Sequence, residues 1–171
     1  MFEKVEKLNE GVWNNETLWK CLLSENKKFG VCDYKDNIVL PFIFDEIEIN
    51  GDKKVIGKIN GKSYYFECNF ENHKTKLEIT GVFYVDSKGQ IVEDEEICYV
   101  NRIGKASPNL WIIYSDDKKK YGGIDSYGNN IIPFEYDYIS NSVSAGQYEL
   151  LFAIKDKKFG FLDTTGKIVI P

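Results

Sequence analysis

The segment Lys120-Tyr-Gly-Gly-Ile-Asp125 decides the fold, because its pattern returns elsewhere in the chain. Two other segments, 28–33 (KFGVCD) and 158–163 (KFGFLD), share its order of lysine, aromatic residue, glycine, any residue, apolar residue and aspartate. In all three copies an aliphatic run ends in a proline eight residues after the aspartate, at Pro41, Pro133 and Pro171. A motif that returns with constant spacing predicts a repeat architecture.

The first and third repeats continue beyond the proline with Phe-x-aromatic-Asp-x-Ile, at residues 42–47 and 134–139. A weaker copy over 84–92 keeps the middle of the pattern, but the acidic run 93–96 replaces its proline and aromatic residue. These copies predict one unit built several times over, with an irregular second member.

The segment 61–67 (GKSYYFE) echoes the aromatic-glycine strand, with Tyr64 where the glycine would stand. We interpret residues 51–80 as a repeat distorted by an inserted hairpin. The prediction is a single β-repeat domain over residues 1–171, with repeats at roughly 18–47, 55–97, 110–139 and 150–171.

This residue pattern resembles the WG repeat, also called the KWG repeat, a family common in bacterial proteins. The resemblance covers 28–47, 120–139 and 158–171, and in part 55–92, with phenylalanine or tyrosine in the tryptophan position. It implies an all-β array in proteins that mostly have no assigned activity. The chain departs from the family pattern because no repeat has tryptophan before glycine and the second repeat has lost its proline.

The tight turn inside each repeat indicates β-structure from the residues themselves. Asp-x-x-Gly occurs at 86–89, 125–128 and 163–166, where the carboxylate can accept hydrogen bonds from amides one to three residues onward. The glycine can take a positive φ, and Asp36 stands in its place in the first repeat. The flanking runs of Val, Ile, Phe and Tyr are too short for ordinary helices.

The predicted fold class is therefore all-β, an antiparallel β-hairpin repeat array. We expect a strongly twisted sheet, which can curl into a barrel or a partial solenoid. We also expect the aromatic residue before each repeat glycine to shield the gap that the glycine leaves.

Composition restricts the class of protein. The chain has 171 residues, of which 43% are hydrophobic, 15% aromatic and 29% charged, as in a folded globular domain. Its net charge of −5 argues against nucleic acid as a partner, because phosphate binding needs clustered lysine and arginine. The charged start of the sequence lacks the apolar run of an export signal, so we expect a cytoplasmic protein and no membrane partner.

The sequence contains few residues or motifs that are typical of catalytic or metal-binding sites. His73 is the single histidine and lies in the polar stretch 71–76, where we expect a solvated hairpin tip. No C-x-x-C pair occurs, and repeat alignment predicts that Cys21 and Cys32 face each other across one hairpin as buried free thiols. No phosphate loop, nucleophile elbow or zinc-protease motif occurs either. We therefore predict a non-catalytic protein with no cofactor and no metal.

Two features are candidates for binding. Trp13 lies outside the repeat pattern and is the tryptophan we expect to be exposed, whereas Trp19 and Trp111 share one repeat position and should pack inside. The acidic run offers a surface for a basic partner, or is simply a solvated loop. The predicted binding residues are therefore Trp13, Glu93, Asp94, Glu95 and Glu96.

The function that these observations favour is a protein-interaction module, such as an inhibitor or an immunity-type partner. The alternative is a binder of a small ligand or carbohydrate that uses exposed aromatic residues. Phe2 to Val5 resembles residues 44–47, so this segment either packs beside the strand at 168–170, within one chain or head to tail between copies, or simply begins the first repeat. We thus expect a monomer or a head-to-tail oligomer.

Overall fold

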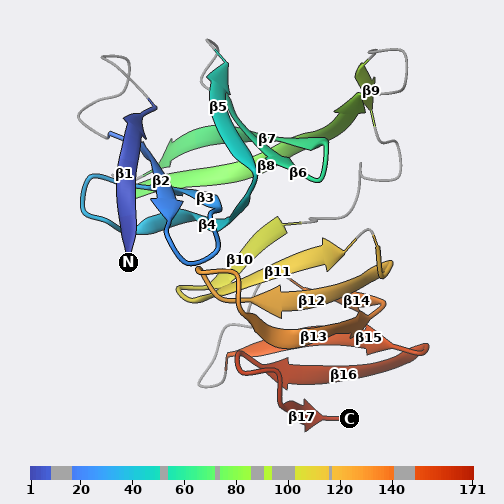
Figure 1. Cartoon of the computed structure of the whole chain (residues 1–171). Coiled ribbons are helices and arrows are strands. Elements are labelled where there is room, and N and C mark those ends of the chain that lie inside the picture. The colour runs from blue at the N-terminus through green and yellow to red at the C-terminus, as the bar shows by residue number, and fades with distance from the viewer. Residues whose placement is uncertain are drawn as a thin grey trace. The chain divides into compact units, whose positions relative to one another are not determined.

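Figure 1 shows the computed structural model of the chain, in which the described residues form strands and turns and no helix. The structure describes residues 1–8, 17–50, 54–71, 74–85, 91–93, 103–115, 117–140 and 149–171, and for parts of 49–103 it describes the backbone alone. The all-β prediction is confirmed. Within these residues nothing has the length and apolarity of a membrane-crossing helix.

The chain divides into an N-terminal half, Met1–Val100, and a C-terminal half, Asn101–Pro171. Each half contains two antiparallel sheets, in which the strands follow one another in sequence order. The single domain over 1–171 stays a prediction.

The N-terminal half contains two sheets, β1–β4 and β5–β9. Their strands are β1 (Phe2–Lys7), β2 (Trp19–Leu23), β3 (Phe29–Cys32) and β4 (Ile38–Phe44), then β5 (Glu46–Asn50), β6 (Lys54–Ile59), β7 (Lys62–Glu71), β8 (Lys74–Val85) and β9 (Ile91–Glu93).

The C-terminal half contains the sheets β10–β13 and β14–β17. Their strands are β10 (Ile103–Ser107), β11 (Leu110–Ser115), β12 (Lys120–Ile124) and β13 (Asn130–Tyr136), then β14 (Tyr138–Ile139), β15 (Leu150–Lys155), β16 (Lys158–Asp163) and β17 (Ile168–Ile170).

The chain passes from one sheet to the next at an aspartate. Asp45 separates β4 from β5, and Asp137 separates β13 from β14, so each Phe-x-aromatic segment ends one sheet and the following x-Ile begins another. The expectation of one curled sheet is corrected here to four sheets, because the strand direction breaks at these corners. Pro41 and Pro133 lie in β4 and β13, at an edge of their sheets, where a missing N–H donor costs no ladder bond.

The tight turns have the predicted chemistry. Gly128 and Gly166 have φ of 90° and 85°, and Asp36 takes the same left-handed conformation with φ of 66°. The Asp163 carboxylate accepts hydrogen bonds from the amides of Thr165 at 2.9 Å and Lys167 at 3.0 Å. The acceptor role is confirmed, with the amides two and four residues onward rather than one to three.

The same bonds recur in the other repeats that the structure describes. Asp125 accepts from the amides of Tyr127 and Asn129, each at 2.8 Å, and Asp33 does so from Lys35 and Asn37. Repetition at a turn therefore explains these aspartates, as the repeat pattern predicted.

The start of the chain begins the first sheet. β1 pairs with β2, with Phe2 opposite Leu23, and Phe2 also contacts the ring of Phe42, with ring centroids 5.1 Å apart. β17 pairs with β16 in the other half. Phe2 to Val5 thus lies in the first sheet, and its packing beside β17, within one chain or between copies, stays a prediction.

Cys21 and Cys32 are buried free thiols on the neighbouring strands β2 and β3, as predicted. They lie diagonally rather than face to face, because Cys21 pairs with Gly30 and Cys32 pairs with Trp19. A hydrogen bond with Cys21, together with burial, raises the pKa of the Cys32 thiol, so this side chain stays protonated and apolar.

Candidate functional site

Strand pairing shows which residues hold equivalent places in the four sheets. Gly30, Gly122 and Gly160 each lie on the second strand of a hairpin, opposite Cys21, Ile113 and Ala153. In the second sheet Tyr64 takes this place and Gly57 lies opposite it. The predicted substitution of tyrosine for the repeat glycine is thus consistent with the pairing.

We call the space above each repeat glycine an aromatic socket, because a ring fills it in two repeats. A Cβ atom added to Gly30 would lie 2.9 Å from the Phe42 ring, and one added to Gly122 would lie 2.6 Å from the Phe134 ring. The ring comes from the next strand and not from the residue before the glycine, which corrects that expectation. Side chains alternate along a strand, so the preceding residue faces the opposite side.

The socket at Gly160 contains no ring. The three atoms nearest to a Cβ added there are backbone atoms, the Ile170 carbonyl oxygen at 2.7 Å and two Pro171 atoms beyond 3.5 Å. Pro171 holds the place of Pro41 and Pro133 in the repeat pattern.

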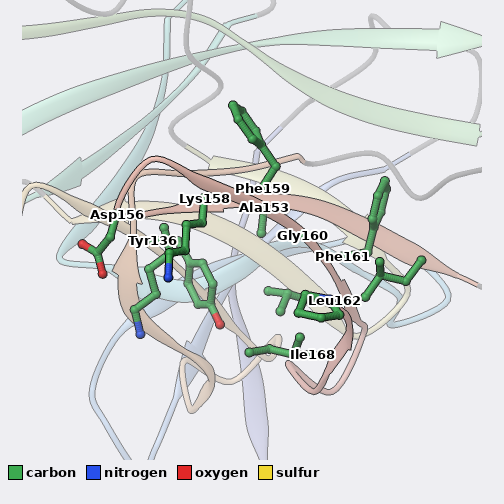
Figure 2. Close-up of a pocket in the computed structure, with 12 residues that line it drawn as sticks. Tyr136, Ala153, Asp156, Lys158, Phe159, Gly160, Phe161, Leu162 and Ile168 are labelled. Atoms are coloured by element: carbon green, nitrogen blue, oxygen red, sulfur yellow. The ribbon is translucent and has the colours of Figure 1, made fainter.

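A groove with a volume of about 240 Å³ lies over this open socket. Figure 2 shows that its labelled lining residues come from β13, β15, β16, β17 and, with Asp156, the turn between β15 and β16, and are mostly apolar or aromatic. An apolar cavity of about 150 Å³ suffices to bind benzene, so the groove has room for an aromatic ring.

Apolar side chains at and beside the groove are unusually exposed. Phe159, Ile168 and Ile170 have exposed fractions of 65%, 59% and 49%. At equivalent positions of the third repeat, Tyr121 is 4% exposed and Ile132 is fully buried, whereas Asn130, the equivalent of Ile168, is exposed. Adjacent exposed apolar side chains of this kind often mark a site of interaction with another molecule.

The aspartate at the first sheet corner connects two hairpins. One Asp45 carboxylate oxygen pairs with the Lys28 ammonium group, and the other accepts the amide of Asn60 at 2.8 Å. Lys28 precedes β3, whereas Asn60 lies in the turn after β6. The Lys28 ammonium group and the Asn60 amide hold the pKa of Asp45 below its ordinary value.

The third repeat has the same corner. Asp137 pairs with the Lys120 ammonium group and accepts the Asp156 amide at 2.8 Å. Lys120 lowers the pKa of Asp137 in the same way. We call this arrangement the aspartate corner.

Lys158 is the equivalent of Lys28 and Lys120 in the last repeat, and it lines the groove. Its side chain is exposed, and within the described part of the chain no carboxylate pairs with it.

The sequence-predicted binding residues are not brought together. Trp13 and the acidic residues Asp94, Glu95 and Glu96 lie outside the described residues, and Glu93 is described only as the backbone end of β9. Their role in binding stays a prediction. His73 also lies outside the described residues.

The two repeat tryptophans pack as predicted. Trp111 is 3% exposed and its Nε1 donates a hydrogen bond to Ser126 Oγ at 3.3 Å. Trp19 packs against the buried cluster that contains Cys21 and Phe42. Among the described residues, histidine, cysteine and acidic side chains form no group able to hold a metal ion.

The groove was not predicted from the sequence. Its lining residues come from β13, β15, β16 and β17, and the motif does not show that these side chains meet.

Comparison with known proteins agrees with the structural repeat. The family described as WG containing repeat matches residues 29–62 and 121–156. The chain contains WG repeats. No curated protein and no solved structure matches it.

The two matched segments include the residues that form the ring-filled sockets at Gly30 and Gly122. Each WG repeat match begins at the aromatic residue before a repeat glycine and runs through the proline, the Phe-x-aromatic segment and the aspartate corner. The WG repeat is a repeat module and not a known enzyme family.

Proposed function

We propose that this WG repeat chain is a non-catalytic module that binds another protein. The observation that supports the proposal is the exposed apolar surface of the last repeat, where Phe159, Ile168 and Ile170 surround a groove of about 240 Å³. Repeat arrays build extended surfaces that bind other proteins. The net charge of −5 keeps the module soluble around this patch.

The test is capture of a partner by the full chain. The wild-type chain and an Ile168→Asp variant are immobilised, and proteins from the native host are identified by mass spectrometry. A protein that binds the wild-type chain, and then forms a defined complex with it when both are purified, supports the proposal. If no purified candidate forms a complex, the proposal is refuted.

A small apolar ligand is the second candidate, because Tyr136, Phe159 and Phe161 all line the groove. The thermal midpoint distinguishes the two functions. A metabolite extract that raises the midpoint of the wild-type chain but not of Ile168→Asp favours a ligand, since binding to the folded state stabilises it.

A further inference from the structure

We propose that Cys21 and Cys32 form a reversible redox switch, in which a small disulfide such as oxidised glutathione converts the two thiols into an intramolecular disulfide. The proposal concerns the first sheet and does not depend on the proposed binding function. Its basis is the strand register, the burial of both thiols and the groups that lie over them.

The two cysteines lie on one face of the first sheet. Cys21 on β2 is opposite Gly30, and Cys32 on β3 is opposite Trp19. Cys21 is two residues from Trp19, and side chains alternate along a strand, so both thiols share this face as diagonal neighbours. The Cys32 thiol donates a hydrogen bond to the Cys21 sulfur. The two sulfur atoms are therefore already in contact in the reduced protein.

Packing of the repeat does not require thiols at these positions. The third and fourth repeats have aliphatic residues there, Ile113 and Ala153 in the place of Cys21, and Ile124 and Leu162 in the place of Cys32. An apolar side chain thus fills either place. The first repeat adds a reactive pair where those repeats have only packing groups.

Neighbouring groups make the two thiols unequal. The hydrogen bond from Cys32 lowers the pKa of Cys21, and the Lys4 ammonium group also lowers it, whereas the hydrogen bond and burial raise the pKa of Cys32. Lys4 is opposite Cys21 on β1, so its side chain lies over the same face, where it pairs with Asp36 at 2.6 Å. The thiolate is the attacking form in thiol–disulfide exchange, so Cys21 is the nucleophile and Cys32 the resolving thiol.

The exchange with the small disulfide takes two steps. The Cys21 thiolate attacks one sulfur of the small disulfide and forms a mixed disulfide, and the thiolate that leaves takes up the proton lost from Cys21. Cys32 then loses its proton and attacks the Cys21 sulfur, which releases the second small thiol. The two cysteines lose two electrons and two protons, and the small disulfide gains both as two thiols.

The diagonal placement makes the disulfide form easy to reduce again. Diagonal residues of antiparallel strands have Cα atoms about 7–8 Å apart, whereas a disulfide usually needs about 4.4–6.8 Å. β2 and β3 must therefore shift against each other to close the bond. Strain of this kind raises the reduction potential, as in labile and regulatory disulfides rather than structural ones.

β1 controls access to the pair. Both cysteines are fully buried, Phe2 packs against the cluster that contains them, and the Lys4 ammonium group lies 5.6 Å from the centre of the Trp19 ring. The side chains of β1 other than Phe2 are exposed, so few apolar contacts hold this strand. A segment with few buried contacts opens at low free-energy cost, and exchange therefore proceeds when β1 separates from β2.

Redox titration of the full chain tests the switch. The protein is equilibrated without oxygen in mixtures of reduced and oxidised glutathione, quenched with acid, unfolded, alkylated, digested with trypsin and analysed by mass spectrometry. Cleavage after lysine puts Cys21 and Cys32 in separate peptides, 21–27 and 29–35. We expect a linked pair of these peptides that is nearly absent in reduced glutathione and is the main form in oxidised glutathione. Samples trapped early should have glutathione on Cys21 rather than on Cys32.

Two substitutions in β1 test the control of access. Phe2→Ala and Val5→Ala both shorten an apolar side chain of this strand, but Phe2 packs against the cysteine cluster and Val5 is 51% exposed. At a fixed concentration of oxidised glutathione, Phe2→Ala should form the linked pair at least about tenfold faster than the wild type, because a partly buried ring is lost. Val5→Ala should change the rate less than about twofold.

The switch is refuted if Cys21 and Cys32 stay reduced in oxidised glutathione, if the reaction stops at mixed disulfides, or if reduced glutathione does not reopen the linked pair. Early glutathione on Cys32 overturns the assignment of the nucleophile. Equal rates for Phe2→Ala and Val5→Ala overturn the role of β1. The titration uses the wild-type chain, so its result stands even if a variant unfolds.

Discussion

The first and last sheets carry the same lysine-aromatic-glycine strand, yet one is closed and the other open. In the first sheet Phe42 is fully buried above Gly30, and Lys28 pairs with Asp45. In the last sheet no ring lies above Gly160, and Phe159 is 65% exposed. The strand sequence alone therefore does not decide exposure, because the covering residues come from the segment after the proline.

This difference is energetic as well as geometric. A buried phenylalanine contributes roughly 1.5–3 kcal/mol through loss of water contact, whereas an exposed one contributes little. The first repeat buries its aromatic ring in the core, whereas the last repeat leaves Phe159 exposed. Substitutions at paired positions should show this difference.

The largest difference is expected between Phe42→Ala and Phe159→Ala. Phe42→Ala should lower the free energy of unfolding by about 3–5 kcal/mol, because it leaves a cavity in the core. Phe159→Ala should change it by no more than about 0.5 kcal/mol. Urea unfolding followed by circular dichroism measures both, and equal losses would show that the last repeat is closed in solution.

A smaller difference is expected between Gly122→Ala and Gly160→Ala. The new Cβ at Gly122 would lie 2.6 Å from the Phe134 ring inside the sheet, so overpacking should cost about 1–3 kcal/mol. At Gly160 the new atom meets the Ile170 carbonyl oxygen on the exposed edge strand β17, which can shift. Thermal melts of both variants should show the larger fall for Gly122→Ala, and the reverse order would contradict an open socket.

The tight turns of the two C-terminal repeats have the same conformation, so substitutions in them should have similar effects on stability. These turns therefore serve as a reference for the comparisons above. Gly128→Val and Gly166→Val should each cost somewhat more than about 1 kcal/mol, because a β-branched residue is strained at positive φ. Thr164→Val, in the same turn as Gly166, is the control. If Gly166→Val is as mild as this control in a chemical denaturation series, the turn geometry is not required.

The smallest expected effect is the loss of thermal stability at acidic pH that results from protonation of the aspartate corner. The pKa of Asp137 is lowered in the folded chain, so its ionised form stabilises the fold above the unfolded value of about 3.9, and this contribution is lost as pH falls through the lower folded value. Wild type should therefore lose more thermal stability than Asp137→Asn between neutral pH and acid below pH 4. A Lys158→Gln variant should follow the wild-type pH profile, and parallel profiles for wild type and Asp137→Asn would refute the corner's role.

Much of the fold could be predicted from the repeat motif, because turn chemistry is local. Asp125 and Gly128 lie three residues apart in sequence, so their hydrogen bonds and φ follow from residue type. The burial of Trp111 and Cys32 was also predictable, because both have apolar counterparts at the same repeat position.

What could not be predicted depends on side chains from the next strand. The ring above Gly30 belongs to Phe42, twelve residues onward, and a bulge between β3 and β4 sets which residue reaches it. The corner at Asp45 breaks the sheet, and the motif gives no sign of that change in direction. The groove beside Gly160 was missed for the same reason, since side chains from several strands line it.

The aspartate corner also gives a kinetic observable. The amides of Asn60 and Asp156 lie at exposed turns, where exchange with solvent deuterium is normally fast, yet each donates its proton to a corner carboxylate at 2.8 Å. The exchange rate of one turn amide therefore reports how often two successive hairpins separate. Acceleration at Asp156 without acceleration in the strands would mean that adjacent repeats part while each stays folded.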